Sequence, residues 1–420
     1  IAVRPARANT VFIVNDAGVS SDIAPGDGIC DANAATGEQC TLRAALEELN
    51  IQGVNATTHE IQFNISGSGP HLIQPATNLP NVRVPVHIAG SCQPGASCPT
   101  ADQPANLQIV LDGQHNPDVF RVGLYFAGGS FNAHGSSVHG LVIGNFYSGV
   151  EITADDVQIA CSHLGVAADG VPAMPNQNGV NLVIAHQAII GGEATASQRN
   201  VISGNGVGLS TPFFAEGEVL IVNNFIGTTA DGLSPLGNGT GIDLTFSNSQ
   251  IGGIGAFAPN VISGNVGQGV VLDSDDHLVL GNRIGVGADG ETAVSNGSEG
   301  VYISGNDNQV GGVAAGEANL IAHNGEVGIG VADLGATGNN LRGNSLHSNA
   351  ELGIDLGADG ADSNDALDVD TGANGRLNYP ELTAVSVTGQ IDGSYSSAAN
   401  QSVTLAFYSS PNCHPLGHGD

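Results

Sequence analysis

The densest group of residues that could do chemistry lies between positions 355 and 374. Aspartate and asparagine recur there at intervals of one to four residues, among glycines that let main-chain carbonyls turn inward. Calcium prefers six to eight such hard oxygen ligands, so the sequence predicts a calcium site, although it lacks the 12-residue loop of an EF-hand. The alternative is an acidic, solvated linker. The predicted ligands are Asp359, Asp362, Asn364, Asp365, Asp368, Asp370 and Asn374.

Two pairs of adjacent carboxylates invite comparison with glycoside hydrolases, which need two carboxyl groups around one bond. These pairs are Asp155-Asp156 and Asp275-Asp276, and they lie 120 residues apart at the same point of an internal repeat. A two-carboxylate site requires a specific separation, which a recurring turn does not select. We therefore interpret both pairs as turn residues and predict no catalytic residue.

Histidine and cysteine give weaker signals for metals. The spacing of His134 and His139, and of His414 and His418, would suit a metal, but no third ligand converges on either pair, so zinc is not expected. Six cysteines instead indicate disulfides and an oxidising compartment. We predict two local disulfides, Cys30 with Cys40 and Cys92 with Cys98, and leave open whether Cys161 pairs with Cys413 or stays a thiol.

The elements that must position these residues follow a repeat of glycine, aliphatic, any residue, aliphatic. It occurs eight times, at intervals of 25 to 33 residues. Repeats of this length mark stacked supersecondary units, and alternating aliphatic residues indicate a short strand with one buried face. We therefore predict an all-β solenoid with one repeat per coil. The repeats begin at Gly149, Gly179, Gly208 (degenerate), Gly241, Gly269, Gly300, Gly328 and Gly353.

Alternate repeats resemble each other more closely than neighbours do. One member of each pair carries Asp-Gly, at 169–170, 231–232 and 289–290, which predicts a loop that leaves the same corner of every second coil. The resulting row of aspartates would form a periodic anionic face. Gly-Asn dipeptides are interpreted as turns whose asparagines stack from coil to coil and satisfy buried amides.

The composition excludes some partners. Forty acidic residues face nine basic ones, lysine is absent, and the formal net charge is -31. This charge argues against nucleic acid or an anionic membrane as partner. No apolar stretch approaches the roughly 20 residues of a membrane-spanning helix. The residues Ala6-Arg7-Ala8 are typical of a signal-peptide cleavage site, so we expect secretion.

Residues 9 to 53 differ from the repeats. A strand-like stretch and an Asp- and Gly-rich loop precede a predicted helix with Thr41 as its N-cap and an apolar face that would cover the first coil. The string Cys-Thr-Leu-Arg-Ala-Ala from Cys40, after Asp-Gly-x-Cys at 27–30, resembles the N-terminal signature of CSLREA-domain extracellular proteins. It departs from that signature at Thr41 and Ala44. The resemblance implies a secreted, right-handed, single-stranded parallel β-helix and no particular activity.

These observations predict an N-terminal cap at 1–53, a parallel β-helix at 54–356, an acidic loop at 357–380 and a partial β module at 381–420. The predicted function is non-enzymatic: a secreted surface or matrix protein, stabilised by calcium, that presents a rigid acidic face for adhesion or assembly. An extracellular polysaccharide or another surface ligand is the expected partner. The alternatives are a polysaccharide lyase or glycoside hydrolase, and the subunit of a filament formed by end-to-end self-association.

Overall fold

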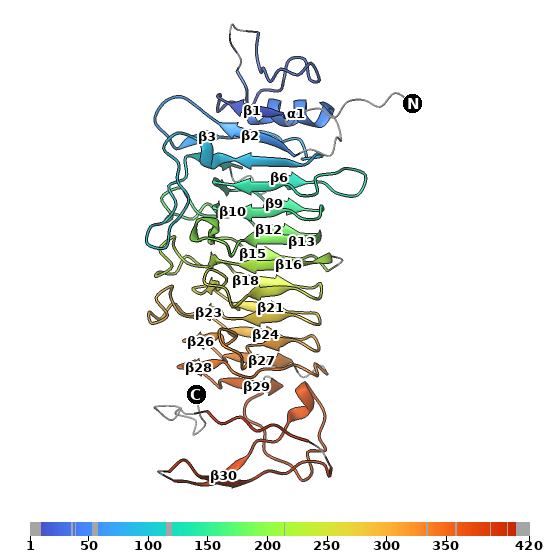
Figure 1. The fold of residues 1–420 in the computed structure, drawn as a ribbon, viewed down its shortest axis with the longest axis vertical. Coiled ribbons are helices and arrows are strands. Elements are labelled where there is room, and N and C mark those ends of the chain that lie inside the picture. The colour runs from blue at the N-terminus through green and yellow to red at the C-terminus, as the bar shows by residue number, and fades with distance from the viewer. Residues whose placement is uncertain are drawn as a thin grey trace.

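The coils of the chain stack along one long axis into a parallel β-helix (Figure 1). The computed structural model describes residues 10–34, 37, 39–52, 58–114, 120–213, 215–332, 335–357, 359–386, 388–400 and 402–408. Within these residues, three long sheets run the length of the body, and neighbouring strands in each sheet are parallel. The prediction of an all-β parallel β-helix is confirmed.

Each complete coil contributes one strand to each sheet, whereas the coils toward the two ends lack one or two of the three strands. Sheet A contains β1 (Val11–Val14), β2 (His59–Phe63), β4 (Val86–Ala89), β7 (Ser137–His139), β10 (Gln158–Ala160), β13 (Ile184–Gly191), β16 (Glu216–Val222), β19 (Gln250–Gly252), β22 (Leu278–Leu280) and β25 (Gln309–Val310). Sheet B contains β3 (His71–Ile73), β5 (Ile109–Asp112), β8 (Leu141–Gly144), β11 (His163–Leu164), β14 (Asn200–Ile202), β17 (Asn224–Ile226), β20 (Val261–Ile262), β23 (Arg283–Ile284), β26 (Leu320–Ala322) and β28 (Ser345–His347). Sheet C contains β6 (Val122–Phe126), β9 (Ser148–Ile152), β12 (Asn178–Leu182), β15 (Val207–Ser210), β18 (Thr240–Leu244), β21 (Val270–Leu272), β24 (Val301–Ile303), β27 (Ile329–Ala332) and β29 (Ile354–Gly357).

The glycine-aliphatic repeat forms sheet C. Ile242 pairs with Val270, which pairs with Val301, and all three side chains are fully buried. The repeated glycine is required for space. A Cβ on Gly241 would lie 2.4 Å from the carbonyl oxygen of Gly269 on the next coil. The motif therefore records how closely adjacent coils approach one another.

Three internal ladders of asparagine connect the coils at the corners. The side-chain amide of one asparagine donates to the side-chain oxygen of the next, as Asn238 does to Asn265 at 3.0 Å. The last step of the third ladder differs, because there the main-chain N–H of Asn339 donates to the side-chain oxygen of Asn374. The predicted stacking of asparagines is confirmed, and it satisfies polar groups that the corners bury. The ladder between sheets B and C is Asn176, Asn205, Asn238, Asn265, Asn296, Asn324 and Asn349; that between A and B is Asn200, Asn224, Asn260, Asn282, Asn319 and Asn344; that between C and A is Asn308, Asn339 and Asn374.

The Asp-Gly loops also match the prediction. Gly232 has a φ of 73°, and Asp231 accepts a hydrogen bond from the N–H of Leu233, so the loop is a tight turn with a left-handed glycine. The loops stack on one another, because the N–H of Ala288 donates to the carbonyl oxygen of Gly232 on an earlier loop. A small apolar cluster with Phe225 packs beneath them.

The N-terminal helix α1 (Leu42–Gln52) lies over β1 at one end of the stack (Figure 1). Thr41 caps it, since its hydroxyl oxygen accepts a hydrogen bond from the N–H of Ala44 at 3.1 Å. Leu42, Leu46 and Leu49 are buried against the first coil. The described helices also include three short 3-10 turns: η1 (Gly90–Cys92), η2 (Ala196–Gln198) and η3 (Ala373–Arg376). Of the described helices, none has the length and apolar character needed to cross a bilayer.

The other end of the stack is covered by the segment that follows β29. This segment contains η3 and an antiparallel hairpin of β30 (Glu381–Val385) and β31 (Ile391–Ser394) (Figure 1). Asn374 in η3 continues the third asparagine ladder, so the segment is bonded to the last coils. Filament formation by end-to-end stacking stays a prediction.

Candidate functional site

The acidic segment after β29 divides into two groups of carboxylates. Asp359 and Asp362 both bind the guanidinium of Arg376, with nitrogen–oxygen distances of 3.0 and 2.7 Å. Arg376 is largely shielded from solvent, which makes this arrangement stronger than an ordinary surface ion pair. Two of the predicted calcium ligands are therefore already neutralised by a cation of the protein.

The second group brings Asp365, Asp368 and Asp370 together, with one oxygen of each lying within 4.8 Å of the others. Asn378 organises the group: its side chain donates to the main-chain oxygen of Asp365, and its N–H donates to Asp368 Oδ1, both at 2.9 Å. Loss of hydration and the charges of Asp365 and Asp368 raise the pKa of Asp370. Such a group can hold one hard cation.

The two predicted asparagine ligands make structural contacts. Asn364 exchanges two hydrogen bonds with the main chain of Tyr379, each 2.9 Å long. Asn374 exchanges two with the main chain of Asn339, at 2.8 and 2.9 Å. Of the seven predicted ligands, the structure thus gathers three. The calcium site itself stays a prediction.

The disulfides correct one part of the sequence interpretation. Cys30 pairs with Cys40 as predicted, but Cys98 pairs with Cys161, and among the described cysteines Cys92 is free and exposed. The predicted Cys92–Cys98 bond is wrong because the loop that carries Cys98 reaches across the coil of β7 and β8 to Cys161, 63 residues further along the chain. The loop that carries Cys98 packs over β5 and β8, beside Cys161. Cys413 lies outside the described residues.

His139 lies beside this disulfide, with its Nδ1 3.5 Å from the Sγ of Cys98. One ligand atom from each of Cys98, His139 and Cys161 falls within 4.8 Å of the others, as in a metal site. The two sulfur atoms are joined to each other, however, and a metal would need both as thiolates. In this state the group is a disulfide packed against an imidazole.

The adjacent aspartates occupy the turn from sheet C to sheet A, as predicted. Asp156 and Asp276 have φ values of 57° and 62°, and Asp307 has 55° at the equivalent position of the next coil after Asp276. A left-handed residue is required at this corner, and aspartate adopts that conformation more readily than most residues. These carboxylates are explained by the turn.

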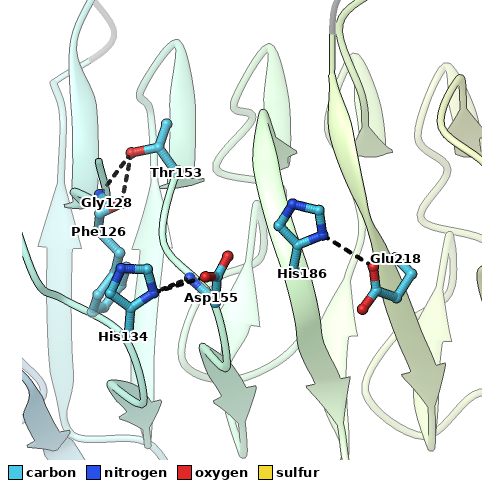
Figure 2. A network of polar contacts seen from close by, with 7 residues as sticks. All are labelled: Phe126, Gly128, His134, Thr153, Asp155, His186 and Glu218. Atoms are coloured by element: carbon cyan, nitrogen blue, oxygen red, sulfur yellow. Dashed lines mark hydrogen bonds and ion pairs between the residues drawn. The ribbon is translucent and has the colours of Figure 1, made fainter. Parts of the chain in front are cut away.

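Two histidine–carboxylate pairs lie side by side along the same corner (Figure 2). His134 contacts Asp155, and His186 on β13 contacts Glu218 on β16; both nitrogen–oxygen distances are 3.1 Å. The hydrogen bond that His186 donates to the Glu218 carboxylate raises the pKa of His186. Within the described part of the chain, no hydroxyl or thiol is bonded to either histidine. The pairs therefore connect neighbouring coils and lack the contacts of a nucleophilic site.

A further group, which the sequence interpretation missed, lies on the outer face of sheet C. Asp243 on β18 is separated from Tyr302 on β24 by one strand, and Asp273 follows that strand. Burial, and then the charge of Asp273, raise the pKa of Asp243 to about 6. The Oδ1 of Asp243 is buried and has no hydrogen-bond partner among the described residues. Asp273 accepts a hydrogen bond from the Ser304 hydroxyl at 2.6 Å.

One sequence signal could have found this face. The variable third position of the glycine-aliphatic repeat points outward, because the second and fourth positions are buried in the core. The register aligns these third positions from coil to coil. They are Glu151, Asn181, Ser210, Asp243, Val271, Tyr302, Gly330 and Asp355.

Comparison with known proteins finds low similarity to solved structures. No family model and no curated protein matches the chain, so the resemblance to CSLREA-domain proteins stays a prediction. Among solved structures, the Dettilon tailspike protein has a TM-score of 0.39 and 16% identity, covering 82% of this chain and 68% of its own. The A-module of the Azotobacter vinelandii mannuronan C-5 epimerase AlgE4 has a TM-score of 0.33 and 14% identity, covering 79% and 92%.

Proposed function

We propose that this protein is an extracellular, non-enzymatic rod that presents a rigid acidic face to a ligand on a cell surface or in a matrix. The observation that carries the proposal is a group of acidic side chains on the strands of sheet C and directly beside them, where the asparagine ladders fix the spacing of consecutive coils. We call these residues the acidic face: Glu151, Asp243, Asp273, Glu299, Glu326 and Glu351.

The charges of the acidic face are close enough to affect one another. Burial, and then the charges of Glu299 and Glu351, raise the pKa of Glu326. The three glutamates follow one another on successive coils, since the N–H of Glu351 donates to the carbonyl oxygen of Glu326. Binding of a cationic group or a metal ion is favourable at a face whose carboxylates repel one another. Its partner would be a basic surface, or a polysaccharide held through cations.

A charge-neutralised variant tests this role. Asp243→Asn, Glu299→Gln and Glu326→Gln together remove three charges from the acidic face, and Asp169→Asn, Asp231→Asn and Asp289→Asn remove three from the corner loops. Binding to a panel of immobilised uronate and neutral polysaccharides and to a polylysine surface is measured by interferometry. We expect at least a tenfold loss of binding for the first variant only. Equal losses in both variants would show a general charge effect and exclude a specific face.

We also propose that calcium binds Asp365, Asp368 and Asp370 and stabilises the segment that covers the last coil. The support is the approach of three carboxylates, where loss of hydration and then mutual repulsion raise the pKa of Asp370. A ligand that binds only the folded state raises the melting temperature. Calcium should therefore raise it, and the variant Asp365→Asn, Asp368→Asn, Asp370→Asn should abolish the effect. Asp359→Asn is the matched control and should keep it; an unchanged melting temperature on chelation rejects the site.

One observation favours a second candidate, a glycoside hydrolase. Asp243, with its pKa raised to about 6, would be protonated as a general acid requires, and Asp273 beside it would act as the ionised carboxylate. The outer face of a parallel sheet could hold a polymer chain across both groups. This reading predicts turnover of a polysaccharide, and Asp243→Asn should abolish it while binding persists.

A further inference from the structure

A cavity of about 830 Å³ lies between the last coil and the segment that covers it. Leu346 and Ile354 of the last coil form one wall, and Tyr379, Phe407 and Tyr408 of the covering segment form another. The hydroxyl oxygen of Tyr408 accepts a hydrogen bond from the N–H of Gly343, which ties this wall to the coil. Cavities of this size with aromatic walls hold small organic ligands.

The apolar residues around the cavity are unusually accessible. Ile354 belongs to the aliphatic row that is fully buried on earlier coils, yet it is 38% exposed. Phe407 and Tyr408 are about half exposed or more, at 49% and 64%. A ligand that removes this aromatic and aliphatic surface from water binds with a favourable hydrophobic contribution.

Asp355 is one of the polar residues of the cavity, together with Asn344, Ser345 and Asp362. Its side chain is 4% exposed; its Oδ2 accepts the N–H of Gly360 at 3.1 Å, and its Oδ1 has no hydrogen-bond partner among the described residues. Burial raises the pKa of Asp355, and the charges of Asp359 and Asp362 raise it further. An unpaired oxygen on a buried carboxylate is costly unless a donor or a cation satisfies it.

A cation of the covering segment, Arg376, already forms ion pairs with other carboxylates. Arg376 binds Asp359 and Asp362, the second of which also lines the cavity. The surroundings of Asp355 therefore keep an excess of negative charge, because three carboxylates share one guanidinium. A neutral or anionic ligand would leave that excess in place, whereas an ammonium group would compensate it and could also contact an aromatic face.

We propose that this cavity binds a small organic cation, with an ammonium group that donates to Asp355 and a flat apolar body that packs between Ile354 and the aromatic wall of Tyr379, Phe407 and Tyr408. This site shares no residue with the acidic face or with the proposed calcium ligands, although Glu351 of the acidic face adds to the negative charge around Asp355. Its chemistry is recognition of an amine, with no bond made or broken.

Three indole compounds of similar shape test the proposal on the full chain: tryptamine, its alcohol analogue tryptophol and an indole carboxylate. Binding is measured by calorimetry at fixed salt. We expect tryptamine to bind at least tenfold more tightly than tryptophol, and the carboxylate to give no binding. Equal affinity for amine and alcohol, or no binding of tryptamine, overturns the proposal.

Two variants locate the site. Asp355→Asn keeps the volume of the side chain and removes its charge, and should lower the affinity for tryptamine to that for tryptophol. Asp392→Asn removes an equal charge at an exposed position of β31 outside the cavity and should leave both affinities unchanged. Leu377 also lines the cavity, so the larger side chain of Leu377→Trp should occupy part of it and abolish binding of both compounds, which tests the site even if Asp355→Asn unfolds. Unchanged tryptamine binding in a folded Asp355→Asn or in Leu377→Trp overturns the assignment.

Discussion

Replacing Asn265 by alanine would remove four hydrogen bonds from the middle of the ladder between sheets B and C. Its Oδ1 accepts from the N–H and the side-chain amide of Asn238, at 3.2 and 3.0 Å. Its side-chain amide donates to Asn296 at 2.9 Å and to the carbonyl oxygen of Ile226 at 3.3 Å. All of these groups are buried, so water cannot replace the lost partners.

The expected loss of stability follows from these contacts. A buried hydrogen bond contributes about 1 kcal/mol net, and an orphaned buried donor costs roughly 1–3 kcal/mol. The two bonds that leave orphaned donors on Asn238 cost roughly 1–3 kcal/mol each and the other two about 1 kcal/mol each, so the free energy of unfolding should fall by about 4 to 8 kcal/mol. Asn181→Ala is the matched control, since Asn181 lies on the outer face and its side chain donates one bond, to Glu151 at 3.1 Å. The control should lose less than about 1 kcal/mol.

Guanidinium unfolding followed by far-ultraviolet circular dichroism measures both losses. Because repeat arrays can unfold in steps, hydrogen exchange should accompany it and should show the loss concentrated in the coils next to Asn265. A loss below about 1 kcal/mol for Asn265→Ala, or equal losses in both variants, would refute the claim that the ladders hold the coils together.

Three further predictions concern the coils. Gly269→Ala would place a Cβ 2.6 Å from the carbonyl oxygen of the next coil, so we expect a loss of roughly 1–3 kcal/mol by denaturant unfolding; a neutral effect would show that the coils can separate. Burial lowers the pKa of His277 to about 4. As the pH drops, the unfolded state therefore binds a proton before the folded state does. The free energy of unfolding should fall by up to about 3 kcal/mol between a pH of about 6.5 and a pH of about 4. His277→Asn should flatten this part of the pH profile, and an unchanged profile would contradict the assignment. Under non-reducing conditions, Cys161→Ser should lower the free energy of unfolding by about 4 kcal/mol, because it opens the loop that the disulfide with Cys98 closes. Cys92→Ser should change it little. A larger loss for Cys92→Ser would instead support a disulfide between Cys92 and Cys98.

The repeat made the fold predictable, because its glycines and aliphatic residues report packing that recurs on every coil. The asparagine ladders and the left-handed aspartates at the corners could be predicted for the same reason. The pairing of Cys98 with Cys161 could not, since it depends on how an irregular loop lies across neighbouring coils.

The candidate sites divide along similar lines. The density of acidic residues identified the segment that contains Asp365, Asp368 and Asp370, but composition alone did not indicate that Arg376 would take two of the seven predicted ligands. Asp243 was missed because its environment is set by neighbours from other coils. Asp355 lies in the same repeat position, and its burial depends on the covering segment. The environments of Asp243 and Asp355 depend on which residues of other coils lie beside them, so they could be identified only from the structure.

The measurement that tests the central claim most directly is turnover of the polysaccharide panel by the wild-type protein, followed as reducing ends and as the ultraviolet absorbance of unsaturated products, with and without calcium. Asp243→Asn serves as the reference for background. The account predicts that polymers which bind are released unchanged and that both proteins give the same background signal. Sustained turnover by the wild type that disappears in Asp243→Asn would contradict the account and assign the protein to the glycoside hydrolases.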